Sequence, residues 1–236
     1  VTAAGCLAGA GTLAPLVNLR QGLPYPMLYR MIFPTRKENR KVRTNPPDSN
    51  MAPRERTVSG RVRFTRPVIE ELARQGLCAI DMHCHTCHSD APVRVRDALS
   101  RASALGIGLS ITDHNEVSGC RQALASSPGS IVIPGIEISA LDGPHILVYF
   151  SALPDLIDFY RSHIERKKQA SPYLAIRLTT SEILDRVSGY HCLCTAAHPF
   201  GYLLFNKGVG RCVERNYLPP EIIKQFDAVE AICGGM

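Results

Sequence analysis

The sequence lacks the features that mark a membrane, secreted or repeat protein. Its apolar N-terminal stretch, AAGCLAGAGTLAPLV, is too short and too rich in glycine for a membrane span, and no charged region precedes it as in a signal peptide. The nine cysteines are scattered and odd in number, unlike a disulfide framework. No internal repeat is evident. We therefore expect a cytoplasmic protein with reduced thiols and no membrane span.

Basic charge is concentrated in one segment. Residues 30–66 hold eleven Lys and Arg but three acidic residues, whereas the rest of the chain holds 16 basic and 18 acidic residues. Seven prolines also fall within residues 1–66. Such a run can bind nucleic acid or anionic lipid, although it is more typical of a solvated linker, and a nucleic-acid partner is not otherwise indicated. We predict a proline-rich, partly disordered basic arm over residues 1–66 and one domain over residues 67–236.

The second segment alternates between short apolar runs and helical patterns. This alternation indicates parallel strands joined by crossover helices, and so an α/β fold. The expected strands cover residues 77–83, 107–115, 130–139, 145–150, 191–200 and 227–233. The expected helices cover residues 95–106, 154–168 and 180–189, with a short one at PPEIIKQF.

Residues 81–91, DMHCHTCHSDA, concentrate metal-binding side chains. The Cys84–His88 portion matches a haem-attachment pattern, but it ends an apolar strand and has no signal peptide before it, which argues against haem. A structural zinc site would need a second ligand pair, and Cys192 with Cys194 is a weak candidate. His83 and His85 lie two residues apart on a strand and therefore share one face, as two ligands of one catalytic ion would.

Other polar residues also fall at strand ends. Imidazole and carboxylate ligands together suit zinc, manganese or iron, and a glutamate such as Glu137 can bridge two ions. His88 is the least secure candidate, while His163 and His191 are assigned structural or surface roles. The residues that end or begin predicted strands in this way are His83, His85, Asp113, His114, Glu137, His145 and His198.

The stretches DMHCHTCHSDA, SITDHN, PGIEIS, HILVYF and AAHPFG, in this order, resemble the polymerase-and-histidinol-phosphatase (PHP) family. The resemblance implies a distorted seven-stranded β/α (TIM-like) barrel with two or three divalent metal ions. His83, His85 and Glu137 would bind the first ion, Glu137, His145 and His198 the second, and Asp90 with His114 the third. Asp81 and Asp113 would orient the histidines. The implied catalytic residues are Glu137, His114 and Asp113.

The family's last motif, an Asp-x-His pair, is absent, and the chain ends at EAICGGM. We therefore expect a barrel that is truncated and incomplete at its C-terminus.

The expected function is hydrolysis of a phosphate monoester or diester, on a nucleotide or small phosphorylated metabolite, by a metal-activated hydroxide. Lys207 and Arg211 in FNKGVGR either contact the phosphate or are ordinary exposed loop charges. An amidohydrolase-type hydrolase also uses a His-x-His pair, but no lysine ends a predicted strand to serve as its carboxylated bridge. A degenerate metal-binding or regulatory module without catalysis is the remaining alternative.

Overall fold

The computed structural model describes residues 68–126, 130–171, 174–201 and 208–230, together with the backbone of three short N-terminal strands. These are β1 (Thr2–Ala4), β2 (Leu16–Leu19) and β3 (Leu28–Met31). The strands fall inside the segment expected to be an arm, and β1 pairs with β4. The proposed boundary between residues 66 and 67 stays a prediction.

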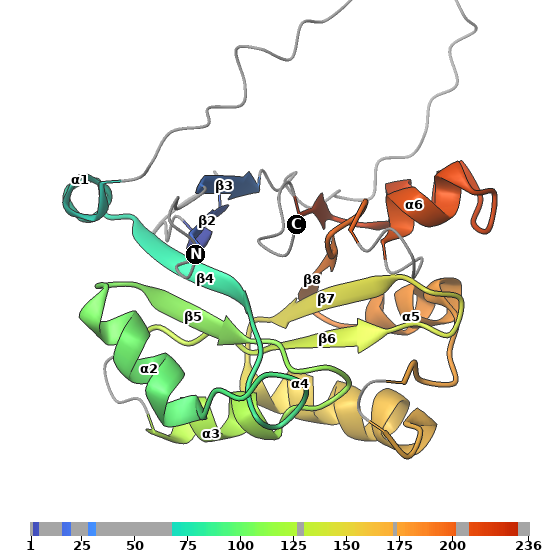
Figure 1. Ribbon diagram of the computed structural model, residues 1–236, viewed down its shortest axis with the longest axis horizontal. Helices are drawn as coiled ribbons and strands as arrows, with labels where there is room; N and C mark the ends of the chain where they lie inside the picture. Colours follow the sequence, from blue (N-terminus) through green and yellow to red (C-terminus); the bar gives the residue numbers. More distant parts are fainter. Residues whose placement is uncertain are drawn as a thin grey trace, which may run out of the picture.

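The strands form two sheets (Figure 1). The first has the order β3-β2-β1-β4-β5 and the second has the order β6-β7-β8-β9. Two isolated parallel bridges, Leu109–Val132 and His114–Glu137, connect the end of one sheet to the beginning of the other. The bounds of the strands are Cys78–Cys84 (β4), Gly108–Ile111 (β5), Gly135–Ser139 (β6), His145–Phe150 (β7), Cys192–Ala196 (β8) and Ala228–Val229 (β9).

One strand runs against the predicted direction. β4 and β5 are parallel, as are β8 and β9, but β7 is antiparallel to both β6 and β8. The physical reason is the connection, because residues 140–144 form a tight turn that can join only antiparallel neighbours. The expectation of parallel strands throughout is therefore wrong. The α/β class is confirmed, but the strands in the described ranges do not close into a barrel.

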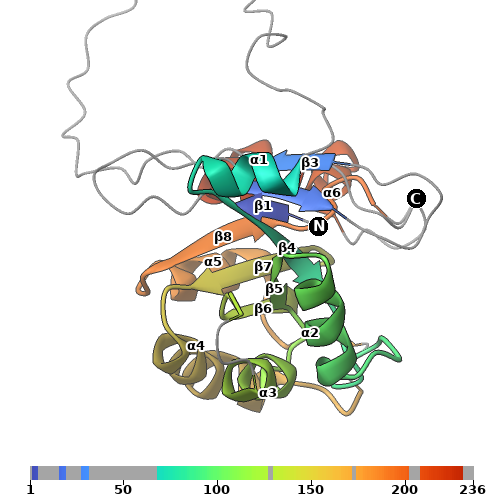
Figure 2. The same cartoon turned by 90° about the vertical axis from the view of Figure 1, so that its left-hand side faces the viewer.

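Helices α2, α3 and α4 lie together on one side of β5, β6 and β7 (Figures 1 and 2). The predicted helices at residues 95–106, 154–168 and 180–189 are present, whereas α1, α3 and α6 were not predicted. No helix in the described ranges is both long and apolar enough to cross a membrane. The helical segments are Ile69–Arg74 (α1), Val95–Ala104 (α2), Ser118–Ser126 (α3), Leu153–Phe159 (α4), Tyr160–Ile164 (η2), Glu165–Lys167 (η3), Thr180–Val187 (α5), Val209–Glu214 (α6) and Pro220–Gln225 (η4).

The two faces of the second sheet have different roles. Ile136 and Ile138 of β6 belong to the main core, which also contains Leu156 and Phe159 of α4. Because side chains alternate along a strand, Glu137 points to the opposite face. On β7, Leu147 and Tyr149 belong to a smaller apolar cluster that also contains Ile80 and Met82 of β4. The sheet thus holds a buried carboxylate on a face that has its own apolar packing.

Candidate metal centre

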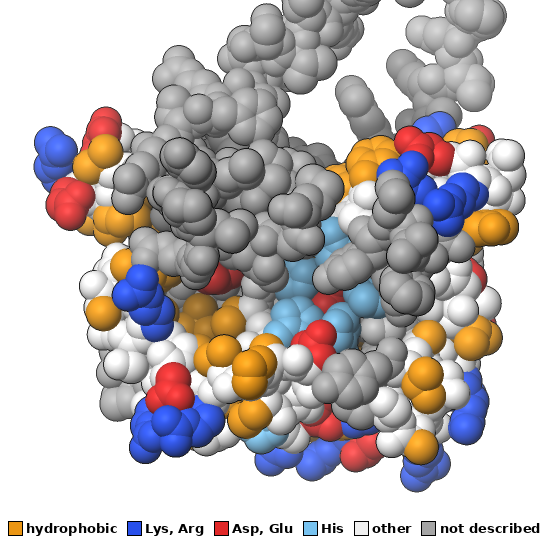
Figure 3. Space-filling model, viewed as in Figure 1, with side chains coloured by type: hydrophobic (Ala, Val, Ile, Leu, Met, Phe, Trp, Pro, Cys, Tyr) orange, Lys and Arg blue, Asp and Glu red, His pale blue; other side chains and the backbone are white. Residues whose placement is uncertain are grey.

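Five histidines surround Glu137, and we call this set the histidine circle. Adjacent imidazole rings lie with centroids 5.0, 4.6, 4.8, 5.0 and 5.9 Å apart, and the last pair closes the circle back to its first member. Pale-blue histidine side chains gather at the middle of the molecular face in Figure 3. The circle runs in the order His83, His85, His114, His145 and His198.

The strand directions explain how residues far apart in sequence meet. His83 lies near the end of β4, His114 follows β5, Glu137 is in β6 and His198 follows β8. His145 instead begins β7, but β7 is antiparallel to its neighbours, so its first residue lies beside their last ones. The structure therefore brings together five histidines that the sequence placed as candidate ligands at strand ends or starts, whereas His191, at the start of another predicted strand, lies elsewhere.

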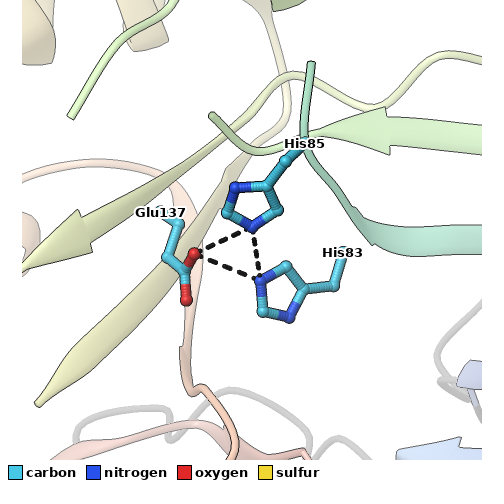
Figure 4. Close-up of side chains that lie close together, drawn as sticks. All are labelled: His83, His85 and Glu137. Atoms are coloured by element: carbon cyan, nitrogen blue, oxygen red, sulfur yellow. Dashed lines mark hydrogen bonds and ion pairs between the residues drawn. The ribbon is translucent and has the colours of Figure 1, made fainter. Parts of the chain in front are cut away.

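The two oxygens of Glu137 face different members of the circle. Oε2 lies 3.2 Å from His83 Nε2, 3.0 Å from His85 Nε2 and 3.2 Å from His114 Nδ1 (Figure 4 shows the first two). Oε1 lies 3.3 Å from His145 Nδ1 and 3.2 Å from His198 Nε2. A carboxylate placed in this way can serve one ion through each oxygen.

Three overlapping groups have their potential ligand atoms within 4.8 Å of one another. His198 contacts Glu137 but is not a member of these groups, so the pairing of His145 with His198 around one ion stays a prediction. No cysteine of the described ranges is a member. The groups are His83–His85–Glu137, His85–Asp90–His114 and His114–Glu137–His145.

Unsatisfied polar atoms show that these residues fit a cation. Neither ring nitrogen of the buried His145 makes a hydrogen bond to the described residues, and neither does Glu137 Oε2 despite its three nearby ring nitrogens. Buried polar groups are seldom left without a partner in folded proteins. A divalent ion would satisfy both the imidazole lone pairs and the carboxylate, and this donor set suits zinc, manganese or iron.

Electrostatics keep the carboxylates of the site ionised. Burial alone would raise the pKa of Glu137, yet the neighbouring His83, His114 and His145 hold it well below its ordinary value. Hydrogen bonds from His114 and His85 likewise lower the pKa of Asp90. Burial lowers the pKa of His145 to about 4 against the opposing effect of Glu137, so its imidazole is neutral at pH 7. Ionised carboxylates and neutral imidazoles are the forms that bind metal.

Two histidines of the circle hold a proton more tightly than usual. Burial works against the charged form of His83, but Glu137 and Glu230 raise its pKa well above the ordinary value. Burial also opposes the charged form of His85, and the carboxylates of Asp90 and Glu137 nevertheless raise its pKa to about 9. A metal ion would have to displace these protons in order to bind.

Glu230 is a residue of the site that the sequence analysis missed. It follows β9 and is buried, with Oε1 3.1 Å from His83 Nδ1 and Oε2 accepting a hydrogen bond from the backbone N–H of His198 at 2.6 Å. A signal was present in the stretch DAVEAIC, which places Glu230 between the apolar pairs Ala228–Val229 and Ala231–Ile232.

Asp81 and Asp113 bond to backbone and loop groups. Asp81 accepts a hydrogen bond from the backbone N–H of His83 at 3.2 Å. Asp113 accepts bonds from the Thr86 N–H at 2.6 Å, the Thr86 hydroxyl at 2.8 Å and the Ser89 hydroxyl at 2.8 Å. It therefore anchors the loop that carries Asp90, and its predicted orienting and catalytic roles stay predictions.

Asp90 lies at the solvent side of the site. Its side chain is 34% exposed, and its oxygens lie 2.8 Å from His85 Nδ1 and 3.5 Å from His114 Nε2. The corresponding exposed fraction is 12% for both of these histidines and 1% for Glu137. Within the described residues, the site therefore opens on the Asp90 side.

The remaining candidates lie outside the circle. His88 Nε2 is 3.0 Å from Gln122 Oε1, and His191 Nδ1 is 3.2 Å from Ser151 Oγ. Arg211 donates to Glu214 at 2.7 Å within α6, and its predicted phosphate contact stays a prediction. Lys207 lies outside the described residues.

No family model matches the sequence, and no curated protein matches it. Solved structures are similar, among them one named as a metal-dependent phosphoesterase from Bifidobacterium adolescentis, with 18% identity over 61% of this chain and 72% of that chain and a TM-score of 0.44. An amidohydrolase from Chromobacterium violaceum, with bound sulfate and no metal, is 18% identical over 53% of this chain and 68% of its own, with a TM-score of 0.40.

A lesion-specific endonuclease from Pyrococcus furiosus is also similar, with 19% identity, 52% of this chain covered and a TM-score of 0.45. The match spans about a third of that endonuclease, 34% of its chain. The chain is thus similar in structure to metal-dependent phosphoesterase and endonuclease structures. Because these TM-scores lie below 0.5, an activity has to be inferred from the histidine circle and Glu137 themselves.

Proposed function

We propose that this protein is a metal-dependent phosphoesterase that hydrolyses a phosphate monoester or diester, on a nucleotide or another small phosphorylated metabolite. The observation that supports the proposal most strongly is the position of Glu137, whose two oxygens each face different histidines at 3.0–3.3 Å. Phosphoryl transfer benefits from two neighbouring cations, because negative charge develops on both the attacking and the leaving oxygen.

The circle would hold two or three divalent ions, of zinc, manganese or iron. His83, His85 and Glu137 would bind one ion. Glu137, His114 and His145 would bind another, and His198 lies 3.2 Å from Glu137 Oε1, the oxygen that also faces His145. His85, Asp90 and His114 form the third group. When bound, such ions lower the pKa of a water molecule and neutralise the charge of a phosphate group.

The protein's own residues would orient the ester and exclude water. Glu137 and His83 lie on the closed side, where the smaller apolar cluster packs, so bulk water is kept away from the centre. The ester would enter on the Asp90 side, the more exposed side of the described site. There Asp90 and His114, 3.5 Å apart, would help to hold the ion of the third group beside the ester.

An amidohydrolase-type centre fits less well. Such a centre usually bridges its ions with a carboxylated lysine, and in this protein Glu137 already lies between the two sets of histidines. Lys168 forms its ion pair with Glu116, at 2.6 Å. Glu137 therefore takes the bridging position, which favours the phosphoesterase.

The test is hydrolysis of an aryl phosphate monoester and a diester by wild type, His85→Ala and His191→Ala, after treatment with a chelator and again with added manganese or zinc. His191 is the matched control, because it is a histidine that contacts Ser151 and not the circle. We expect activity that requires metal, a loss of at least about 100-fold in His85→Ala, and no change in His191→Ala.

Two results would contradict the proposal. Turnover that survives complete chelation would exclude a metal mechanism. Equal activity of the two alanine variants would exclude a role for the circle. Metal binding without any turnover would instead favour a binding or regulatory module.

A further inference from the structure

Glu230 joins two histidines that arrive from different sheets. Its carboxylate is 3.1 Å from Nδ1 of His83, which is 147 positions earlier in the chain, and 2.6 Å from the backbone nitrogen of His198. The Glu230 backbone N–H also donates to Ala196 O at 2.9 Å, which fixes the residue against β8. Both carboxylate oxygens are thus used, and each by a different candidate ligand.

The contact to His83 determines which ring nitrogen is available to a metal ion. A neutral imidazole carries one proton, and the hydrogen bond made by one nitrogen sets the state of the other. If Nδ1–H donates to Glu230, Nε2 keeps its lone pair. His83 Nε2 is the nitrogen that faces the site, 3.2 Å from Glu137 Oε2 and 3.0 Å from His85 Nε2. Glu230 therefore favours the tautomer that can bind metal.

The contact to His198 stabilises an unusual backbone conformation. His198 has a φ of +26°, in the left-handed region that residues other than glycine seldom occupy. Such conformations persist only where surrounding contacts hold them. The Glu230 carboxylate accepts the His198 N–H, and the Gly201 N–H donates to His198 O at 2.7 Å. These two bonds fix the direction in which the His198 ring points, which is toward Glu137.

From these contacts we infer that Glu230 is a positioning residue of the metal centre, which fixes the tautomer of His83 and the backbone of His198 together. The inference rests on the proposed function insofar as the circle must bind metal. It does not require any particular substrate, because Glu230 contacts ligands and not the open side of the site.

The test compares zinc affinity, measured by competition with a chelating dye, in wild type, Glu230→Gln, Glu230→Asp and Asp227→Asn. Glutamine keeps the shape of the side chain but replaces one oxygen by an NH₂ group. Its oxygen would stay with the His198 N–H, so the NH₂ would donate to His83 Nδ1 and move the ring proton to Nε2. We expect zinc to bind about 10–100-fold more weakly to Glu230→Gln.

Asp227 is the matched control. Asp227 lies three residues before Glu230, and its carboxylate accepts a hydrogen bond from the Cys194 backbone N–H at 2.9 Å. This bond is of the same type as the one from His198 N–H to Glu230, but it involves no histidine of the circle. Asp227→Asn should therefore bind zinc like wild type. Glu230→Asp separates chemistry from packing, because it keeps the charge but is one methylene shorter. We expect it to bind zinc more tightly than Glu230→Gln.

A spectroscopic readout follows the tautomer directly. In ¹⁵N NMR spectra of the zinc-loaded protein, His83 of wild type should show a protonated Nδ1, and Glu230→Gln should lose that signal. Equal zinc affinity in wild type and Glu230→Gln, or weaker binding by Glu230→Asp than by Glu230→Gln, would overturn the inference and leave the proposed function intact. A wild-type chain that binds no zinc, manganese or iron would overturn both.

Discussion

Replacing Glu137 by glutamine removes the negative charge at the centre of the histidine circle. The side chain is buried, with five ring nitrogens within 3.0–3.3 Å of its two oxygens. In the metal-free protein the charge of Glu137 stabilises the protonated forms of His83 and His85. Glutamine cannot do so. The two imidazoles would then be buried either as cations with only Glu230 and Asp90 to compensate them, or as neutral rings with fewer hydrogen bonds.

The magnitude follows from the pKa of His85. A rise from 6.5 to about 9 corresponds to about 3 kcal/mol of the free energy of unfolding, shared between Asp90 and Glu137. His83 adds a contribution of the same sign. We expect Glu137→Gln to lose roughly 3–5 kcal/mol in the metal-free state, the usual cost of breaking a buried ionic pair.

The pH dependence gives the sharper test. A histidine whose pKa is raised by folding stabilises the protein fully below its unfolded value of 6.5, and this stabilisation is lost as the pH rises through about 9. The difference in the free energy of unfolding between wild type and Glu137→Gln should therefore be largest near pH 6 and should become smaller above pH 9. Urea unfolding of chelator-treated protein at both pH values measures it.

Glu116→Gln is the matched control for this experiment. Glu116 is partly buried and lies 2.6 Å from Lys168. Burial alone would raise its pKa, but the hydrogen bonds from Lys168 and Ser118 lower the pKa to about 2. A lowered carboxyl pKa gives stability that is present above 4.5 and is lost only as the pH falls toward 2. The cost of Glu116→Gln should thus be constant from pH 6 to 9. A constant cost for Glu137→Gln as well would refute the reasoning about His83 and His85.

Two further predictions concern proton release and packing. Zinc binding near pH 7.5 should release protons, because His85 has a pKa of about 9 and His83 also holds its proton tightly. Calorimetry in buffers of different ionisation enthalpy measures this release. The zinc affinity should also rise with pH. Gly119→Ala should lower the free energy of unfolding by about 1–3 kcal/mol, because a Cβ at that position would collide with Asp113 Oδ2 and Thr86 Oγ1. Chemical denaturation would measure the loss, and a neutral effect would show that the loop carrying Asp90 can shift freely.

The strands from β4 onward and the five histidines of the circle could be predicted because both leave local patterns, whereas β1, β2 and β3 fall in the segment that was expected to be an arm. The apolar runs of β4, β6 and β7 identify buried strands, and a histidine or glutamate at the end of such a run is conspicuous. Strand direction leaves no such pattern, because the apolar pattern of a strand is the same whether the strand pairs in parallel or antiparallel with its neighbours. The five-residue turn before His145 did carry the information, since it is too short for a crossover helix.

The missed features depend on small residues or on distant contacts. Helix α3, SGCRQALAS, buries mainly Gly119, Cys120 and Ala123, so its apolar periodicity is weak. Glu230 was missed because its partner His83 is 147 positions away and no short spacing links the two. The loop-anchoring bonds of Asp113 were missed for a related reason, since Thr86 is 27 positions earlier.

The histidine circle also lies across the joint between the two sheets. His83, His85 and His114 come from the sheet that contains β4 and β5, whereas Glu137, His145 and His198 come from the sheet that contains β6, β7 and β8. Between β5 and β6 the backbone is paired only through the Leu109–Val132 and His114–Glu137 bridges within the described residues. An ion bound by Glu137 together with His83, His85 and His114 would therefore link the two sheets. The stability of the fold would then depend on the concentration of free metal. By mass action, free metal at about 100 times the Kd would add about 2.7 kcal/mol to the free energy of unfolding of the protein.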